Sequence, residues 1–287
     1  MSSAEAEHLR LVALRAARVS ADYLRSVFRQ RMSVQDKISP HDLVTEHDHA
    51  SEALLRKAIL AEVPDSVIIG EEGGALGAGR GTWHGDPIDG TVNFASGIGF
   101  WCVSVAAAVD DELVAGVIID PMAGLEYSAD LTAFYINDEQ VQRGPAGPES
   151  AATLICTFPR FHDLDAVGDL ALEVTDTLTR APGSIRAMGS GSLGLAHVAA
   201  GWGDATFDLH TNSWDVAAGW LMVQRAGGRY VGFDRGDPDE NPRTAYTRHG
   251  YVALGPGADF PVLLDAGRRL SAAATRCICP GWDLSAI

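Results

Sequence analysis

Basic residues are scarce in this chain. Its 287 residues include 38 acidic and 22 basic ones, for a formal net charge of −16, and the basic residues are nearly all arginine and scattered. The sequence contains no basic patch, which argues against nucleic acid or an anionic membrane as a partner. The surplus of acid serves either solubility or the binding of cations by a few gathered carboxylates. Only the local pattern distinguishes these two roles.

Cysteine and long apolar runs are also scarce. The four cysteines are Cys102, Cys156, Cys277 and Cys279. They lack paired metal-ligand spacing, so we interpret them as free thiols in a reducing compartment. Glu5, Glu7 and several arginines interrupt the first apolar positions, which fits neither a signal peptide nor a membrane span. We therefore expect a cytoplasmic protein, long enough to bury a large core in one large or two closely packed domains.

The first half reads as two helices followed by an antiparallel sheet. Apolar spacing predicts a helix over 5–30 and a second helix that Thr45 caps, with Asp48 in its first turn. A strand is predicted from Val67 to Gly70, and the Gly-rich segment 73–81 is expected to be a flexible flap. Further strands are predicted at 100–109, 113–119, 124–129 and 133–136.

The second half alternates between strands and helices. The predicted strands are 151–157, 184–187, 205–209, 228–233 and 251–254, and the predicted helices are 163–180, 190–201, 214–226 and 260–275. Such alternation indicates a layered α/β architecture. Because 137–150 is rich in polar residues, glycine and proline, we expect two halves, 1–145 and 146–287.

The most informative stretch runs from Trp83 to Phe94, which we interpret as a loop between strands. Asp86 and Asp89 flank Pro87 and Ile88, and proline stiffens the turn that holds both carboxylates. A carboxylate within an apolar segment needs a cation or several hydrogen-bond donors. Carboxylates from separate segments suit Mg²⁺, so Glu71, Asp86, Asp89 and Asp215, with the Ile88 carbonyl, form a candidate cation site.

Four segments carry a resemblance to a known family. They are Gly70-Glu71-Glu72, Asp86-Pro87-Ile88-Asp89-Gly90-Thr91-Val92-Asn93-Phe94, Trp214-Asp215-Val216-Ala217-Ala218-Gly219, and Asp42-Leu43-Val44-Thr45-Glu46-His47-Asp48. In order and spacing they resemble the motifs of the inositol monophosphatase family, from about the first helix to residue 233. The resemblance implies an α-β-α-β-α sandwich, a Mg²⁺-dependent phosphomonoesterase activity, a homodimer and inhibition by Li⁺.

The resemblance also implies roles for individual residues. Glu71, Asp86 and the Ile88 carbonyl would hold one Mg²⁺, Asp86, Asp89 and Asp215 a second, and Glu71 a weaker third. Thr91 and Asp48 would orient and deprotonate the attacking water, and the Gly90 and Thr91 amides would hold the phosphate. Arg186 and Gly191 would border the substrate. Asp208 stands where inositol phosphatases often have a glutamate that binds substrate hydroxyls, so this chain departs from the family pattern at the residue that contacts the alcohol part of the substrate.

Other functions remain open at this point. The substrate expected is inositol 1-phosphate, with histidinol phosphate, fructose 1,6-bisphosphate and 3′-phosphoadenosine 5′-phosphate as alternatives. Gly189 to Gly194 is a literal G-x-G-x-x-G between a strand and a helix, so an NAD-dependent oxidoreductase is an alternative of another class. A regulatory protein that retains the fold without turnover is a third.

Overall fold

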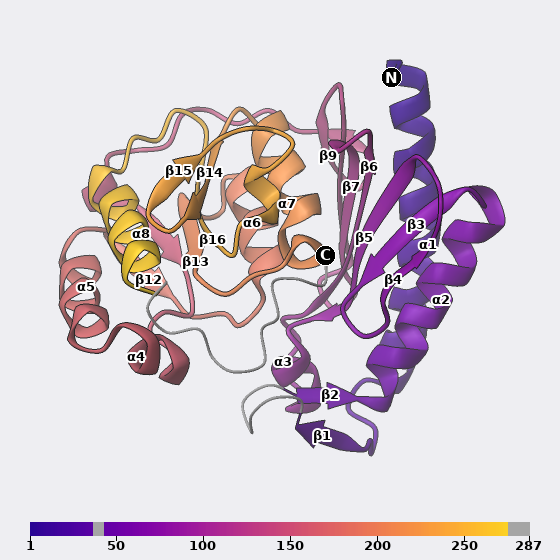
Figure 1. Ribbon diagram of the computed structural model, residues 1–287, viewed down its shortest axis with the longest axis horizontal. Helices are drawn as coiled ribbons and strands as arrows, with labels where there is room; N and C mark the ends of the chain where they lie inside the picture. Colours follow the sequence, from indigo (N-terminus) through magenta and orange to yellow (C-terminus); the bar gives the residue numbers. More distant parts are fainter. Residues whose placement is uncertain (37–42, 275–287) are drawn as a thin grey trace.

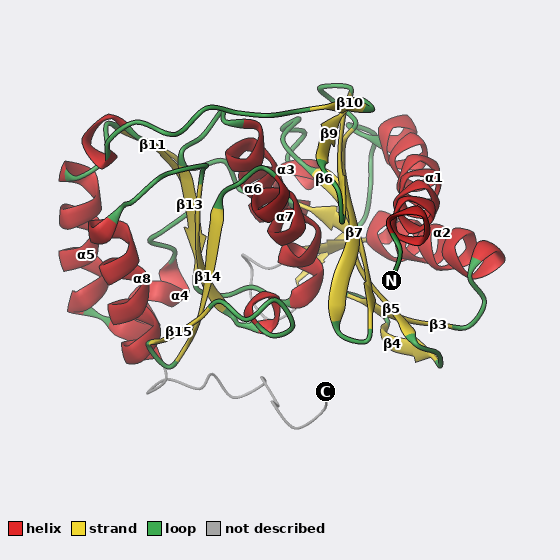
Figure 2. Ribbon diagram, turned by 90° about the horizontal axis from the view of Figure 1, so that it is seen from above, coloured by secondary structure: helices red, strands yellow, loops and turns green. Residues whose placement is uncertain are grey.

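Two sheets alternate with three layers of helices in the computed structural model, which describes residues 1–36 and 43–274. The helices of the outer layer on the first sheet are α1 (Ser3–Val27) and α2 (Glu46–Glu62), the central pair is α6 (Gly191–Ala200) and α7 (Ser213–Arg225), and the far layer holds α4 (Phe161–Val167), α5 (Asp169–Arg180) and α8 (Pro261–Ala274). Figure 2 shows these five layers side by side. The predicted α-β-α-β-α sandwich is confirmed.

The first sheet has eight strands, coloured violet to magenta in Figure 1. In spatial order they are β10 (Glu139–Gln140), β9 (Phe134–Ile136), β8 (Leu125–Asp130), β7 (Glu112–Asp120), β6 (Cys102–Val109), β5 (Gly81–Asp89), β3 (Ser66–Gly70) and β4 (Gly74–Gly77). Only the β3–β5 pair among them is parallel. Strands β1 (Val34–Asp36) and β2 (Leu43–Thr45) form a separate two-stranded antiparallel sheet.

Two sequence predictions in this region are wrong. Gly74–Gly77 of the supposed flap is the edge strand β4, because its backbone pairs with β3 in antiparallel register. Most of the supposed loop 83–94 is strand β5, followed by the short helix α3 (Thr91–Ala95). A strand that is buried on both faces, as β5 is, does not alternate apolar and polar residues, so its sequence lacks the usual sign of a strand.

The second sheet has six strands in the order β12 (Ser184–Arg186), β11 (Thr153–Ile155), β13 (Ala205–Asp208), β16 (Gly250–Leu254), β14 (Arg229–Asp234) and β15 (Asp237–Asp239). It is parallel at β12–β11–β13 and antiparallel beyond. The helix predicted over 163–180 is interrupted at Gly168, whose φ of 55° ends α4 before α5 begins.

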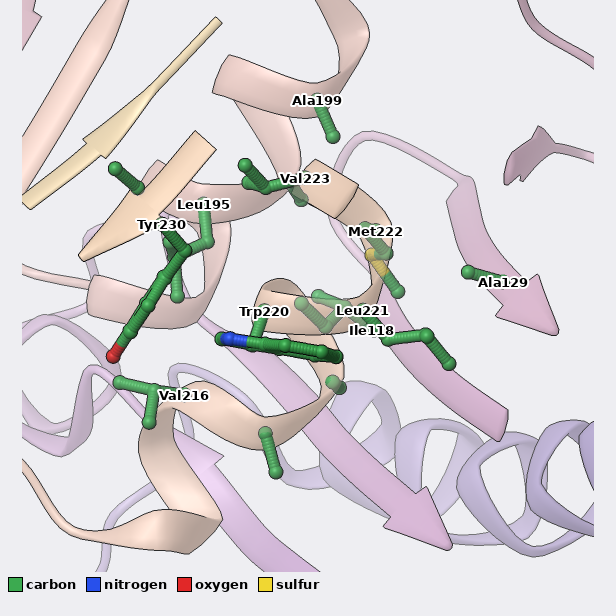
Figure 3. Close-up of a cluster of buried hydrophobic side chains, with 14 of the residues drawn as sticks. Ile118, Ala129, Leu195, Ala199, Val216, Trp220, Leu221, Met222, Val223 and Tyr230 are labelled. Atoms are coloured by element: carbon green, nitrogen blue, oxygen red, sulfur yellow. The ribbon is translucent and has the colours of Figure 1, made fainter. Parts of the chain in front are cut away.

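The central helices share one core with both sheets. Figure 3 shows side chains of α6 and α7 beside Ile118 of β7 and Tyr230 of β14, and Ala129 of β8 belongs to the same buried cluster. A Cβ at Gly219 would lie 2.4 Å from the Leu195 Cβ, so glycine is what lets α7 approach α6 this closely. This core contains residues from both predicted halves, so the division at residue 145 stays a prediction. Among the described residues, no helix is long and apolar enough to cross a membrane.

Candidate metal centre

Asp86 and Asp89 lie at the carboxyl end of β5. Asp86 pairs with Ser104 and Asp89 with Cys102, so three steps along β5 match two along β6. Side chains three residues apart on a regular strand point to opposite faces, but one extra residue in a bulge returns them to the same face. The Pro87-Ile88 irregularity thus directs both carboxylates to one place, which is the geometry that the candidate site requires.

Asp215 reaches the same place from the first turn of α7. Its Oδ2 accepts a hydrogen bond from the Asn212 backbone N–H at 2.6 Å, which completes a capping box at the start of the helix. Carboxylate oxygens of Asp86, Asp89 and Asp215 all lie within 4.8 Å of one another. Three of the four predicted acids therefore lie together, although β5 and α7 are more than 120 residues apart in the sequence.

The three carboxylates of this group have raised pKa values. Burial raises the pKa of Asp86 and of Asp215, and in both cases the negative charge of Glu71 raises it further. Glu71 is therefore close, although it lies outside the group of three. Burial also raises the pKa of Asp89, despite hydrogen bonds that oppose the shift. A bound divalent cation would reverse these shifts, because its charge favours the ionised carboxylates.

The Gly-rich segment before α6 holds Asp89. The Asp89 Oδ2 accepts hydrogen bonds from the Ser190 hydroxyl and, at 2.8 Å, from the Ser192 N–H. The Cys102 thiol also donates to it, at 3.7 Å. In a dinucleotide-binding protein these helix-opening amides would face a pyrophosphate. Here they face a carboxylate, so the geometry gives the NAD alternative no support.

Asp48 and Thr91 are in direct contact, as their predicted joint role requires. The Thr91 hydroxyl lies 3.2 Å from Asp48 Oδ1 and 2.9 Å from the Ile88 carbonyl oxygen. The fully buried Asp48 also accepts hydrogen bonds from the Thr45 N–H and hydroxyl, at 2.8 and 2.6 Å, within the predicted cap of α2. Asp42, the first residue of that motif, lies outside the described residues, as do Cys277 and Cys279.

Gly90 separates the strand from α3 and requires glycine. Its φ of 97° lies in the left-handed region, and a Cβ there would lie 3.1 Å from the Phe100 carbonyl oxygen and 3.2 Å from that of Gly189. Asn93 ties the same two segments together, because its side-chain amide donates to the Phe100 and Met188 carbonyls. The turn after Asp89 is therefore clamped against the segment that leads into α6.

The residues predicted to contact the alcohol part of the substrate are not gathered at one place as the three aspartates are. Asp208 ends β13, and its Oδ1 accepts hydrogen bonds from the Leu209 and His210 amides and from the Arg160 guanidinium. Arg186, at the end of the edge strand β12, is exposed and donates to the adjacent Ile185 carbonyl. No described contact brings Arg186 to the three aspartates.

The sequence predicts that specificity for the alcohol lies in side chains around 158–162, 186–192 and 208, but it does not predict the polar cluster that the structure shows beside Asp208. It consists of Arg160, His162, Asp163 and His210, from the start of α4 and the segment after β13. Burial lowers the pKa of His162 to about 4, and the positive charge of Arg160 contributes. The signal available was the spacing of Arg160 to Asp163 before a helix, but nothing in the sequence pairs it with His210.

Fold and site together define a layered α/β protein with a largely buried group of carboxylates of the kind that binds divalent cations. The sequence profile of the Inositol monophosphatase family matches residues 5–265. The chain therefore belongs to the inositol monophosphatase family, whose members are mostly Mg²⁺-dependent phosphatases.

Several relatives are similar over most of their length. The chain is 35% identical to the "Nus factor SuhB" of Pseudomonas aeruginosa over 224 residues, covering 76% of this chain and 82% of that protein. It is 36% identical to the "Inositol-1-monophosphatase" of Mycobacterium leprae over 205 residues, covering 68% and 70%. The crystal structure of the extragenic suppressor protein suhB from Bartonella henselae has a TM-score of 0.78 at 24% identity, covering 94% of this chain and all of that one, and supports the fold alone.

Proposed function

We propose that this protein hydrolyses a small-molecule phosphate monoester in a Mg²⁺-dependent reaction, with inositol 1-phosphate as the expected substrate. The observation that carries the proposal is the convergence of Asp86, which is buried, and of the partly buried Asp89 and Asp215, whose carboxylate oxygens lie within 4.8 Å of one another and whose pKa values are raised. Carboxylate oxygens are the ligands that Mg²⁺ prefers, and the excess negative charge makes binding favourable.

The residues divide into those that hold cations and those that act on the reactants. We assign Asp86, Asp89 and Asp215 to one Mg²⁺, and Glu71, Asp86 and the Ile88 carbonyl to another, with Glu71 also serving a weaker third. Bound Mg²⁺ would supply positive charge for the phosphoryl group and lower the pKa of the attacking water.

The residues assigned to act on the reactants are Asp48 and those of the turn at Gly90. Asp48 Oδ1 accepts the Thr91 hydroxyl hydrogen bond, which fixes both groups for orienting water and taking up its proton. The Gly90 and Thr91 amides are assigned to the phosphate oxygens. Arg186, Gly191 and Asp208 stay candidates for the alcohol, and one Asp208 oxygen is already committed to Arg160 and two backbone amides.

A regulatory role is the alternative from another class. One relative bears the name "Nus factor" and another the name "Inositol-1-monophosphatase", at nearly the same identity. The acidic centre favours catalysis here, because like charges held together cost stability, and perturbed carboxylates of this kind are typical of catalytic sites.

The test is phosphate release by the purified protein from inositol 1-phosphate, histidinol phosphate, fructose 1,6-bisphosphate and 3′-phosphoadenosine 5′-phosphate. We expect release from one of these with Mg²⁺, and its loss with a chelator, in the Asp89→Asn variant and, in part, with Li⁺. Release that persists in the chelator would refute the metal assignment. No release from any of the four in the presence of Mg²⁺ would favour the regulatory alternative. Gel filtration tests the expected homodimer.

A further inference from the structure

The cluster beside Asp208 contains a second set of metal-ligating side chains. One ligand atom from each of His162, Asp163 and His210 lies within 4.8 Å of the other two. The His162 and His210 rings meet edge to face, with centroids 4.5 Å apart, and His210 Nε2 lies 2.9 Å from Asp163 Oδ1. The group differs from the acidic centre in composition, because two of its three ligands are nitrogen.

The positions of these side chains are held by the surrounding backbone. Asp163 is only 1% exposed, and its Oδ2 accepts the Arg160 N–H at 2.6 Å, which places the carboxylate at the first turn of α4. His210 follows β13, whose end is tied to Arg160 through Asp208. Two separate elements therefore deliver the three ligands, as expected of a site formed by the fold.

His162 has an unused ligand atom. Its Nε2 is buried and has no hydrogen-bond partner among the residues that the structure describes. A buried polar atom without a partner costs stability, and such atoms in native proteins call for an explanation, a bound ion being one. Because the neighbouring His210 and Asp163 offer further ligand atoms, an ion there would satisfy His162.

The local charge permits a cation despite the nearby arginine. Arg160 Nε lies 3.7 Å from Asp163 Oδ2, and the guanidinium also bonds to Asp208. Two carboxylates thus face one guanidinium, which leaves one negative charge for an incoming cation. The net negative charge here is smaller than at the acidic centre. Such a site suits a metal that is held mainly through imidazole nitrogen.

We propose that His162, Asp163 and His210 form a second metal site, separate from the acidic centre, for a divalent transition metal such as Zn²⁺. Two imidazoles and one carboxylate are a common ligand set for Zn²⁺ with one position open, whereas Mg²⁺ takes oxygen ligands. Ligand atoms on a tetrahedral Zn²⁺ lie about 3.3 Å apart, so the His162 side chain closes on the other two upon binding. The site does not depend on phosphatase activity.

The experiment measures Zn²⁺ binding by equilibrium dialysis in excess Mg²⁺, which occupies the oxygen centre. We expect one tightly bound Zn²⁺ per wild-type chain. In His162→Gln and in His210→Gln the affinity for Zn²⁺ should fall by at least about 100-fold, which is more than the loss of a residue that only hydrogen-bonds to a ligand would cause. His49→Gln, which alters an exposed histidine on α2, is the matched control and should bind Zn²⁺ like wild type.

The outcome distinguishes the two centres. Asp89→Asn should retain the tight Zn²⁺, and loss of that Zn²⁺ in Asp89→Asn would overturn the proposal by assigning the ion to the acidic centre. X-ray absorption of the Zn²⁺-loaded wild-type protein needs no variant to fold, and it should show two imidazole ligands. A shell of oxygen alone would equally overturn the proposal. Mg²⁺-dependent phosphate release is not a readout here, so either function can fail without the other.

Discussion

Replacing Asp89 by asparagine should stabilise the protein without metal and abolish its stabilisation by Mg²⁺. Asp89, Asp86 and Asp215 place carboxylate oxygens within 4.8 Å of one another; burial raises the pKa of all three, and nearby negative charge raises those of Asp86 and Asp215 further. At an effective dielectric constant near 20, a pair of charges at this distance repels by roughly 3 kcal/mol. The asparagine oxygen can keep the Ser192 hydrogen bond while its NH₂ turns toward the other two carboxylates.

The expected gain is smaller than the full repulsion, since a carboxylate with a raised pKa takes up a proton instead. We expect about 1–3 kcal/mol, or a rise in Tm of roughly 2–8 °C. The sign depends on pH in a defined way. Because the folded pKa of Asp89 is raised above 3.8, the wild type loses stability as pH rises through that raised pKa, so the advantage of the variant is absent below pH 3.8 and grows above it.

The assay is thermal unfolding in a chelator and in Mg²⁺, across pH, with Asp163→Asn as the contrasting control. Burial opposes ionisation of Asp163, but hydrogen bonds from His210 and the Arg160 amide outweigh it and lower the pKa, so that substitution should destabilise the protein with or without Mg²⁺. An Asp89→Asn protein that is less stable in chelator than wild type, yet still gains stability from Mg²⁺, would refute the reasoning.

Three further substitutions test the surrounding geometry. Thr91→Ala removes the 3.2 Å contact with Asp48 and should lower kcat for phosphate release by about 100-fold while calorimetry shows unchanged Mg²⁺ binding; an unchanged kcat would remove Thr91 from the reaction. Gly90→Ala forces a Cβ onto a φ of 97° and should cost about 1–3 kcal/mol in urea unfolding, whereas no loss would mean that the turn relaxes freely. Burial lowers the pKa of His84 to about 4 from 6.5, so its contribution to stability is complete above pH 6.5 and is lost as pH falls toward 4. His84→Gln, which can keep the Ser213 contact, should reduce that loss by about 3 kcal/mol, and an unaltered pH profile would show that folding does not change the pKa of His84.

The sequence alone determined most of the elements and the family, because both depend on local pattern. Apolar spacing was enough for α1, α2, α7 and α8, and Thr45 with Asp48 is a capping pair that acts within one helical turn. The tight turn between β6 and β7 is also local, because it is formed by two adjacent residues with positive φ, Asp110 and Asp111. The family motifs are likewise short contiguous segments, so no knowledge of packing was needed to recognise them.

The tertiary structure alone decided which polar groups meet. A strand buried on both faces has no alternating pattern, so the sequence of β5 predicts a loop, and the bulge that aligns Asp86 with Asp89 is visible only in its register with β6. Similarly, His162 and His210 are 48 positions apart and come together only because β13 ends beside α4. Contacts of this kind depend on how layers stack, and the free energy that selects the stacking is spread over the whole core.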